Sequence, residues 1–257
     1  MLNLISHGQP TDQPGLLIAH GLYGSARNWG VIAKRLSKDR EVITVDMRNH
    51  GASPWFDSHN YHDLAEDLAG VLKSLDRPFD LLGHSMGGKA AMMLGLTRPE
   101  LVHRLLVADI APVAYGHSQI QFIEAMRAVD LQQVESRADA DHQLARHVES
   151  RALRSFFLQS LDIKAGAWQL NLDVLARAMP EILDFPQMDS SFDRPALFLS
   201  GAASDYVSRD ARSEIKRLFP QAGFLKIPGA GHWLHADKPR EFEAAVSGWL
   251  TYQDNSD

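Results

Sequence analysis

The chain has 257 residues, of which 45% are hydrophobic, so it can bury a sizeable core, either as one large domain or as a core with an inserted subdomain. Its net charge is −6, from 26 basic and 32 acidic residues, and the absence of long like-charge blocks argues against a nucleic-acid surface and favours a small-molecule partner. There is no cysteine, which excludes disulfides, thiolate catalysis and cysteine-ligated metal.

The first residues carry no recognisable targeting signal. Residues 1–5 lack both a basic region and a sustained apolar run, which a signal peptide would require. Nowhere in the chain do about eighteen apolar residues follow one another, as a membrane-spanning helix would need. We therefore expect a cytoplasmic protein without a membrane span, in which residues 2–5 form a first edge strand.

A strand, a helix and a second strand follow in the next part of the chain. Residues 16–19 form a short apolar run of the kind found in strands buried on both faces, and they end in the glycine-rich loop 20–25. Residues 29–36 have helical spacing, and residues 41–46 read as the next strand. This order predicts a parallel pair of strands, and the loop suits close approach of the backbone to a ligand.

Residues 64–75 predict an amphipathic helix, because apolar side chains recur in them at helical intervals. The strand that follows, residues 79–83, turns abruptly into a second helix with Ser85 at the corner, as in a nucleophile elbow. Such a tight turn needs small residues on both sides, and Gly83 and Gly87 supply them. The bland alternative is a glycine-rich structural turn with an inert serine.

The next apolar run, residues 105–108, ends in Asp109. An acid at the tip of a strand faces the ligand side of an open parallel sheet. From about residue 113 the character of the chain changes, and residues 120–129, 144–161 and 170–179 predict helices with no convincing strand between them.

We therefore expect residues 113–193 to form a helical cap inserted into an α/β core that comprises residues 1–112 and 194–257. Insertions of this kind commonly act as lids over catalytic sites, although a purely structural insertion is the alternative. The remaining core elements follow in order. They are a strand at 195–201, a loop containing Asp205, a helix at 211–219, a strand at 224–227, a loop at 228–233, a final helix across 242–250 and a frayed tail at 254–257.

A serine needs a base to remove its proton, and that base needs a third group to orient it. His232 is the preferred base, because it lies in a glycine-rich loop after the last core strand and follows Ser85 in the chain. Asp109 is the preferred acid, since an unpaired charge at the end of an apolar strand would be costly. Asp205 and the weaker candidate Asp173 remain open alternatives.

The backbone N–H groups of Leu22 and Met86 are predicted to form the oxyanion hole. His20 is expected to brace the loop that carries Leu22. Arg48 and His50 either bind substrate or pin their own loop.

Two further histidines, His84 and His235, neighbour catalytic positions and are expected to serve packing or hydrogen bonding. No phosphate-binding glycine loop is present, and no histidine or carboxylate grouping has zinc spacing. We therefore predict a site that needs neither a metal nor another cofactor.

Together these residues resemble those of the α/β-hydrolases, and within that family the small bacterial YbfF-type esterases and related mitochondrial abhydrolases. The resemblance covers essentially the whole chain. It rests on the stretches 20–25, 45–51, 83–89, 108–112 and 229–233. It implies a mostly parallel sheet flanked by helices, a helical cap over the acyl site, and hydrolysis of esters and acyl thioesters such as acyl-CoA by Ser85, His232 and Asp109.

The sequence thus predicts a serine carboxylester hydrolase that works through an acyl-enzyme. One rival is an enzyme of the same fold with another reaction, namely carbon–carbon bond cleavage, lyase chemistry or perhydrolysis. The second rival is a non-catalytic binding module on a hydrolase scaffold. The patterns leave the acyl-chain length, the preference between esters and thioesters, and the oligomeric state open.

Overall fold

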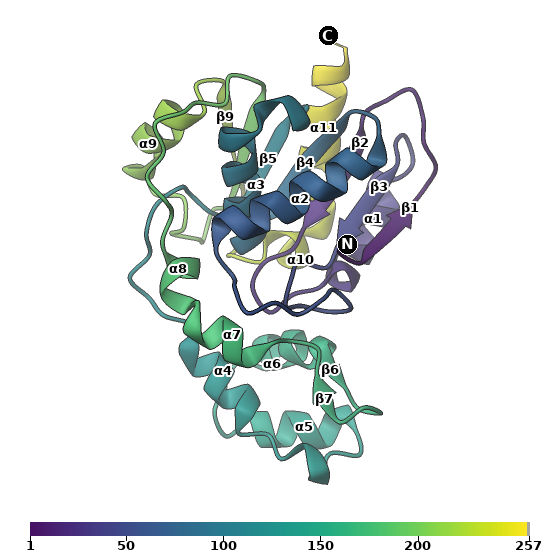
Figure 1. Ribbon diagram of the computed structural model, residues 1–257, viewed down its shortest axis with the longest axis vertical. Coiled ribbons are helices and arrows are strands. Elements are labelled where there is room, and N and C mark those ends of the chain that lie inside the picture. The colour runs from purple at the N-terminus through teal and green to yellow at the C-terminus, as the bar shows by residue number, and fades with distance from the viewer. Residues whose placement is uncertain (256–257) are drawn as a thin grey trace.

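A seven-stranded sheet forms the centre of the computed structural model, which describes residues 1–255 (Figure 1). The strands are ordered β1-β3-β2-β4-β5-β8-β9. Strand β1 pairs antiparallel with β3, and every other neighbouring pair is parallel. The strands are β1 (Leu4–His7), β2 (Gly15–Ala19), β3 (Val42–Val45), β4 (Phe79–His84), β5 (Leu105–Ala108), β8 (Ala196–Gly201) and β9 (Ala222–Ile227). This is the mostly parallel α/β sheet that the sequence predicts.

Helices cover both faces of this sheet, because its central strands are apolar on both sides. The flanking helices are α1 (Gly30–Leu36), α2 (Tyr61–Leu75), α3 (Met86–Thr97), α9 (Ala211–Leu218), α10 (Leu234–Asp237) and α11 (Pro239–Asp254). Neighbouring residues of β2 point into different cores: Leu17 packs in the core with α2 and α3, whereas Leu16 and Ile18 pack with α1 and α11. Short 3₁₀ turns lie at Ala26–Trp29, Pro99–Leu101, Leu131–Gln133 and Leu158–Ser160.

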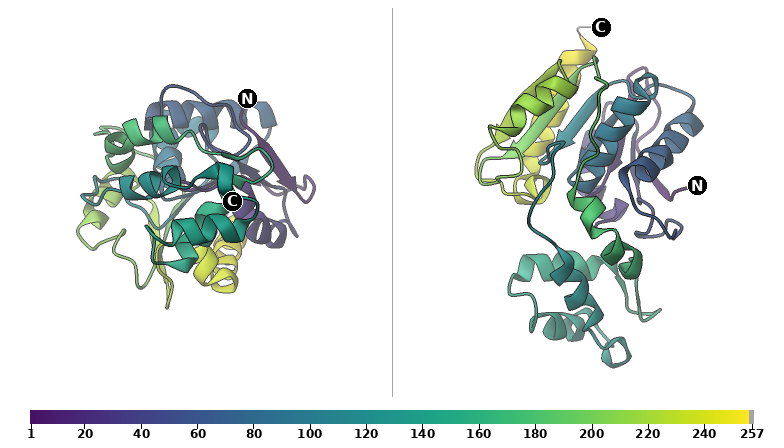
Figure 2. Two further views of the ribbon diagram at one scale, coloured as in Figure 1. Left: turned by 90° about the horizontal axis from the view of Figure 1, so that it is seen from below. Right: turned by 60° about the vertical axis from the view of Figure 1, so that its left-hand side comes forward.

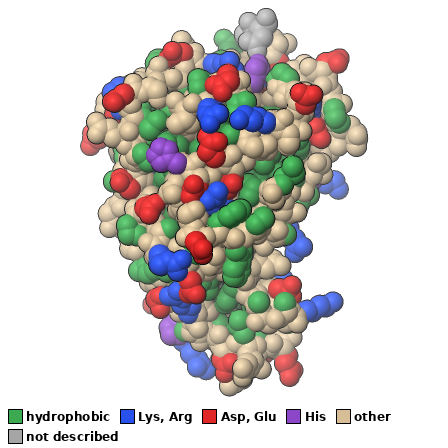
Figure 3. Space-filling model, in the orientation of Figure 1, with side chains coloured by type: hydrophobic (Ala, Val, Ile, Leu, Met, Phe, Trp, Pro, Cys, Tyr) green, Lys and Arg blue, Asp and Glu red, His purple; other side chains and the backbone are tan. Residues whose placement is uncertain are grey.

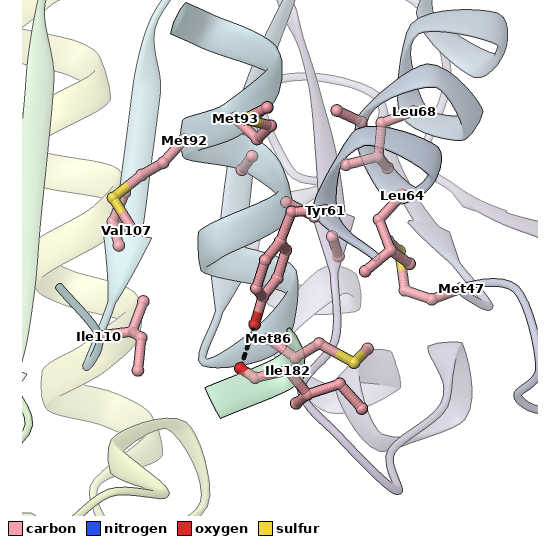
Figure 4. Packing of buried hydrophobic residues seen from close by; sticks show 14 of the residues in the cluster. Met47, Tyr61, Leu64, Leu68, Met86, Met92, Met93, Val107, Ile110 and Ile182 are labelled. Carbon is pink, nitrogen blue, oxygen red and sulfur yellow. Dashed lines mark hydrogen bonds between the residues drawn. The ribbon is translucent and has the colours of Figure 1, made fainter. Parts of the chain in front are cut away.

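The core between α2 and α3 is rich in methionine (Figure 4). Met86, Met92 and Met93 all come from α3 and belong to this core; in Figure 4 the Met92 side chain lies beside Val107 of β5, on the side of α3 away from α2. At the lower edge of this core the Tyr61 hydroxyl donates to the Ile182 carbonyl over 2.6 Å. Flexible thioethers fill irregular gaps well, and this packing holds the first turn of α3 firmly against its neighbours.

The segment between β5 and β8 forms a separate layer at one end of the sheet (Figures 1 and 2). We call residues 113–193 the cap segment. Its elements are α4 (Ile120–Arg127), α5 (Arg137–Leu144), α6 (Arg151–Phe157), β6 (Leu161–Asp162), β7 (Ala167–Trp168), α7 (Leu172–Arg177) and α8 (Met179–Leu183). Its last helix, α8, lies nearest the sheet.

Two expectations for the cap segment were wrong. A short antiparallel pair, β6 with β7, lies where no strand was expected, and Gly166 permits its turn through a φ of +58°. The single helix expected at 144–161 is broken, because Ser150 caps a new helix by accepting from the Leu153 N–H.

The C-terminal helix ends in an ion-pair network rather than in a frayed tail, so the expectation for Asp254 was wrong. Its carboxylate lies 2.6 Å from both the Arg40 and the Arg104 guanidinium. Arg104 also pairs with the fully buried Asp80 over 2.8 Å. Burial of these charges is tolerable because each is paired. Residues 256–257 of the expected tail lie outside the described residues.

Charged side chains of both signs are interspersed on the face shown in Figure 3, so the negative net charge is not gathered into one patch on that face. Within residues 1–255, no helix combines the length and the apolar character needed to cross a membrane.

Candidate active site

Ser85 lies at the sharp turn between β4 and α3 with φ 52° and ψ −119°. This conformation is rarely adopted by residues with a side chain, and it stores roughly 1–3 kcal/mol of strain. The flanking glycines make the turn possible. A Cβ on Gly83 would lie 2.2 Å from the Gly87 carbonyl oxygen, and a Cβ on Gly87 would lie 2.5 Å from the Ala19 carbonyl oxygen.

A continuous hydrogen-bonded chain connects Ser85 to a buried carboxylate. The Ser85 hydroxyl lies 3.1 Å from His232 Nε2, and His232 Nδ1 lies 2.8 Å from Asp109 Oδ2. Because a carboxylate only accepts, Nδ1 carries the proton and Nε2 is free to accept from the serine. The three residues come from three separate loops at the carboxyl end of the sheet.

Asp109 is held by donors from the strand that neighbours its own. It is fully buried, and it accepts from the Gly201 N–H over 2.9 Å and from the Ser204 hydroxyl over 2.5 Å. Asp109 directly follows the last residue of β5, and its φ of +52° lies in the left-handed region. These hydrogen bonds fix the orientation of the carboxylate toward His232.

The two alternative acids lie elsewhere. Asp205 is exposed, and Asp173 pairs with Arg127 over 2.5 Å on the surface of the cap segment. Among the described residues, the carboxylate that contacts the His232 ring is that of Asp109.

Two neighbours of the triad, Ser204 and Tyr206, were not predicted as parts of the site, whereas His84 was expected beside it in a packing or hydrogen-bonding role. Ser204 contacts Asp109, as described above, and the Tyr206 ring stacks on the His232 ring with centroids 3.9 Å apart. His84 Nε2 lies 2.9 Å from the His232 carbonyl oxygen, so it donates to it. The only sequence signal for the first two was their position beside Asp205 in a loop at a strand tip.

The predicted oxyanion loop is packed directly against the serine. A Cβ on Gly21 would lie 3.2 Å from the Ser85 Cβ. The Gly21 carbonyl accepts from His20 Nδ1–H over 2.8 Å and from the Gly24 N–H over 3.0 Å. Because the peptide unit is planar, the Leu22 N–H points away from the Gly21 carbonyl, on the opposite side of the same unit, and the two turn together. His20 therefore braces this loop.

His20 and His50 each lock one tautomer. His20 Nε2 accepts from the Met47 N–H over 3.0 Å, so its Nδ1 carries the proton. His50 Nε2 accepts from the Tyr23 N–H over 3.2 Å, and its Nδ1 donates to the Arg48 carbonyl over 2.9 Å. Both rings thus link the loop 20–25 to the loop that follows β3.

Arg48 and His50 hold the loop in place rather than face a ligand. The Arg48 guanidinium lies 2.6 Å from Asp67 of α2 and 3.1 Å from Asp63, and the His50 ring is fully buried. Of the two roles that the sequence left open for this pair, these contacts favour pinning.

Met86, the second predicted oxyanion residue, is the first residue of α3, where a backbone N–H has no acceptor within its own helix. Its sulfur lies 3.2 Å from His59 Nε2. Met86 and Leu22 line the same cleft beside Ser85. The two residues predicted to form the oxyanion hole therefore border a common space.

The buried imidazoles around the site are neutral. Burial lowers the pKa of His59 and of His235 to about 3. Burial also lowers the pKa of His20, and it lowers the pKa values of His50 and His84 well below the usual value, aided by neighbouring imidazoles. Neutral rings can accept hydrogen bonds from backbone N–H groups, as His20 and His50 do.

The cleft has two arms that meet at Ser85. One arm is aromatic and apolar, and it includes Phe122, Leu153, Phe156, Phe157 and Trp233. The other arm, which we call the polar arm, is lined by apolar side chains and by the polar side chains of Tyr61, Lys89, Tyr115, His117, Gln119 and Tyr206. Both arms contain residues of the cap segment, so the cap segment forms one wall of the site. Within residues 1–255, no cluster of three or more metal-binding side chains is present.

Lys89 closes the polar arm. It is 1% exposed, and its ammonium group donates to the Leu183 and Asp184 carbonyls over 2.9 and 2.7 Å. It also lies 4.8 Å from the centre of the Tyr115 ring. Burial lowers the pKa of Lys89 to about 7. Lys89 thereby ties α3, four residues after Ser85, to the end of α8.

Comparison with known proteins gives consistent matches along the chain. The model of a family described as "Alpha/beta hydrolase family" matches residues 16–245. The chain is 44% identical to the mouse "sn-1-specific diacylglycerol lipase ABHD11" over 248 residues, covering 92% of this chain and 81% of that protein. It is 38% identical to "Esterase YbfF" of Escherichia coli K12, covering 95% and 96%.

A solved structure is also similar. The protein titled "Marine microorganism esterase" superimposes with a TM-score of 0.90 at 37% sequence identity, and the match covers 95% of this chain and 97% of that one. At this identity, the likeness extends well beyond the fold to the sequence itself.

Proposed function

The chain belongs to the alpha/beta hydrolase family and is an ester hydrolase, and from that premise we propose that it cleaves carboxylic esters through an acyl-enzyme formed on Ser85. The observation that carries the proposal is the chain of contacts from Asp109 through His232 to Ser85, with distances of 2.8 and 3.1 Å. In this arrangement His232 can take the Ser85 proton during nucleophilic attack, while Asp109 orients the imidazole and stabilises its positive charge.

In the first half-reaction the Ser85 oxygen attacks the ester carbonyl while His232 Nε2 takes the hydroxyl proton. The Asp109 carboxylate stabilises the resulting imidazolium through the Nδ1 hydrogen bond. The N–H groups of Leu22 and Met86 bind the oxyanion of the tetrahedral intermediate. When the intermediate collapses, His232 returns the proton to the leaving alcohol, and the acyl group stays on Ser85.

In the second half-reaction water takes the place of the alcohol. His232 removes a proton from the water, the resulting hydroxide attacks the acyl carbonyl, and the proton passes back to Ser85 as the free acid leaves. The enzyme returns to its starting state without any cofactor. Overall, the reaction consumes one water and one ester and yields the alcohol and the free acid.

The substrate class follows from the cleft and from the relatives. The apolar arm offers an aromatic wall for a hydrocarbon chain. The mouse relative is named a diacylglycerol lipase and the bacterial one an esterase, and both names share hydrolysis of a carboxylic ester. We propose a small-molecule acyl ester as the partner of this site.

Acyl thioesters fit the same mechanism. A thiol is more acidic than an alcohol, with a pKa of about 8.5, so its anion leaves with less help from His232. Rates measured on an oxygen ester and a thioester with the same acyl group would rank the two. A preference for the thioester in kcat/KM would extend the proposed function to substrates such as acyl-CoA.

The test of the proposed function is labelling by a fluorophosphonate probe, read as the mass of the intact protein. We expect one adduct on the wild type and none on Ser85→Ala, whose ester hydrolysis should fall by roughly 10⁴-fold or more while its melting temperature stays close to that of the wild type.

Labelling that persists in folded Ser85→Ala would contradict the choice of nucleophile. A folded wild-type protein that takes no label and hydrolyses no ester would favour the non-catalytic binding module. An active serine that turns over diketones or forms peracids, but not esters, would favour the other reactions of this fold.

A further inference from the structure

Tyr23, the residue after Leu22, has an unusual backbone and is tethered on three sides. Its φ of +64° lies in the left-handed region, which bulky residues rarely enter. It is only 2% exposed. A conformation of this kind persists only where the surroundings hold it, so the contacts of Tyr23 decide the shape of the loop.

One tether comes from the core and two from the cap segment. His50 of the core accepts from the Tyr23 N–H over 3.2 Å. Ser160 of the cap segment donates its hydroxyl proton to the Tyr23 carbonyl over 3.1 Å. The Tyr23 hydroxyl in turn donates to the carbonyl of Gln119, at the start of α4, over 3.0 Å.

The cap segment also contacts the core loop that carries His50. The Gly51 N–H donates to the Gln169 carbonyl over 2.8 Å, and the Asn171 N–H donates to the Asn49 carbonyl over 3.0 Å. Residues 50 and 170 form an isolated β-bridge. The position of the cap segment is therefore linked to Tyr23 both directly and through the loop of His50.

We propose that Tyr23 is a positioning residue that couples the cap segment to the oxyanion hole, so that the Leu22 N–H is aligned for catalysis only while Ser160 and Gln119 hold Tyr23. This inference rests on the proposed function, because it concerns the oxyanion donor of that reaction. The cap then has two tasks: it walls the cleft and it completes the catalytic geometry.

The physical reason is the shared backbone. The Gly21–Leu22 peptide is fixed at its carbonyl by His20, and the Leu22–Tyr23 peptide is fixed at its N–H by His50. Leu22 lies between two planar units, so its orientation depends on both. When the cap-side tethers are lost, the left-handed Tyr23 can relax, and the Leu22–Tyr23 peptide turns with it.

The experiment compares Ser160→Ala and Tyr23→Phe with the wild type. Each variant deletes one hydroxyl tether and leaves Ser85, His232 and Asp109 unchanged. With a short-chain nitrophenyl ester we expect kcat to fall about tenfold, as weakened oxyanion stabilisation implies, and KM to change by less than about twofold.

A second readout separates this role from a structural one. A trifluoromethyl ketone forms a tetrahedral adduct whose oxyanion occupies the oxyanion hole, whereas the methyl ketone with the same chain binds without one. We expect the inhibition constant of the first to rise in step with the fall in kcat, and that of the second to stay constant. The double variant should lose little more than either single one, because both act on Tyr23.

Ser190→Ala is the matched control. The Ser190 hydroxyl also bonds the cap segment to a core carbonyl, that of Leu96 over 2.9 Å, but far along the chain from the oxyanion loop. Variants at Ser160 and Tyr23 that behave like this control would overturn the proposal, and so would equal losses for both ketones. Failure of the proposed function would show itself separately, as an unlabelled wild type.

Discussion

In the proposed mechanism, the orientation of a single imidazole, that of His232, decides whether Ser85 can be activated. The Asp109 carboxylate holds the Nδ1 proton of His232 and so leaves Nε2 able to accept. Ser204, Tyr206 and the carbonyl contact of His84 secure the ring and its acid from other sides. The placement of the His232 ring and of Asp109 thus depends on several residues outside the triad.

We predict that Asp109→Asn lowers kcat by roughly 10³–10⁴-fold. An asparagine amide facing Nδ1 would donate to it and place the imidazole proton on Nε2, where it blocks acceptance from Ser85. Asp205→Asn and Asp173→Asn should retain activity close to the wild type. Steady-state kinetics of the three variants checks this, and a large loss in Asp205→Asn with activity retained in Asp109→Asn would reverse the choice of acid.

The sequence was informative about residues whose role depends on local chain geometry. Ser85 between two glycines and Asp109 at a strand tip are readable, because the turn and the strand end are encoded nearby. Ser204 and Tyr206 were not read, because their partners are 95 residues away and 26 residues away in the chain. Asp205 drew attention to the right loop, but its carboxylate is exposed, and the carboxylate that contacts the His232 ring is that of Asp109.

At the scale of elements, the strongest periodicities gave reliable predictions. The apolar strands of the sheet and the helix at Tyr61–Leu75 follow directly from their patterns. The cap segment was harder, since its helices are short and its polar residues give little periodicity. Its break before α6 depends on one capping serine, Ser150, and its strand pair is only two residues long on each side.

Lys89 connects two elements, α3 and the end of α8, and this gives a prediction about pH. Burial lowers its pKa from 10.5 to about 7. Between these values the unfolded chain binds a proton that the native state lacks, so the free energy of unfolding rises with pH in this window. Lys89→Met has no titrating group at this position, so its free energy of unfolding lacks this rise with pH.

We therefore expect the stability difference between wild type and Lys89→Met to grow, in favour of the wild type, from pH about 7 to about 10. Urea unfolding at several pH values measures it. Lys34→Met, at an exposed position of α1, is the control and should show a constant difference. Parallel curves for wild type and Lys89→Met would contradict the prediction.

In the molecule as a whole, a buried ion-pair network and the proposed active site lie at opposite ends of the sheet. Asp80 lies near the start of β4, whereas Ser85 follows its end, roughly 16 Å away at the usual rise of a strand. Asp80, Arg104, Arg40 and Asp254 join β4, β5 and α11 at the first end. Substitutions in that ion-pair network should therefore leave kcat/KM unchanged.

We predict that Asp254→Ala lowers the free energy of unfolding by about 2 kcal/mol, because it removes one of the two carboxylates that Arg40 and Arg104 share and leaves only Asp80 to pair with both. Its kcat/KM should match the wild type. Glu214→Ala, which breaks a surface pair with Arg217, should cost at most about 1 kcal/mol. Equal losses in the two variants, measured by urea unfolding, would show that the network adds nothing.

The cluster of neutral histidines makes the whole molecule sensitive to acid. For His235 the pKa falls from 6.5 to about 3, chiefly through burial. The unfolded chain therefore binds a proton between these values, and stability is lost as the pH falls through that window. His59 behaves in the same way. We expect unfolding well before the carboxylates are all protonated.

His235→Phe tests this with little disturbance, because the ring stacks on Trp29 with centroids 4.1 Å apart and its Nδ1 has no partner among the described residues. Between pH about 6 and 4, the free energy of unfolding should fall with decreasing pH less steeply in this variant than in the wild type. The difference between the two slopes should be about 1.4 kcal/mol per pH unit. Thermal melts across this range provide the measurement, and an unchanged slope would contradict it.

The cap segment leaves the sheet after β5 and returns to it at β8, and these two strands are hydrogen-bonded neighbours, with Leu105 opposite Ala196. The segment is therefore a module that one lineage can exchange for another without altering any strand register. Substrate range can diversify through that module alone. By the proposal above, however, a replacement cap segment would also need a hydroxyl in the place of Ser160. Without it, the enzyme would have a different cap but would lose the alignment of the Leu22 N–H.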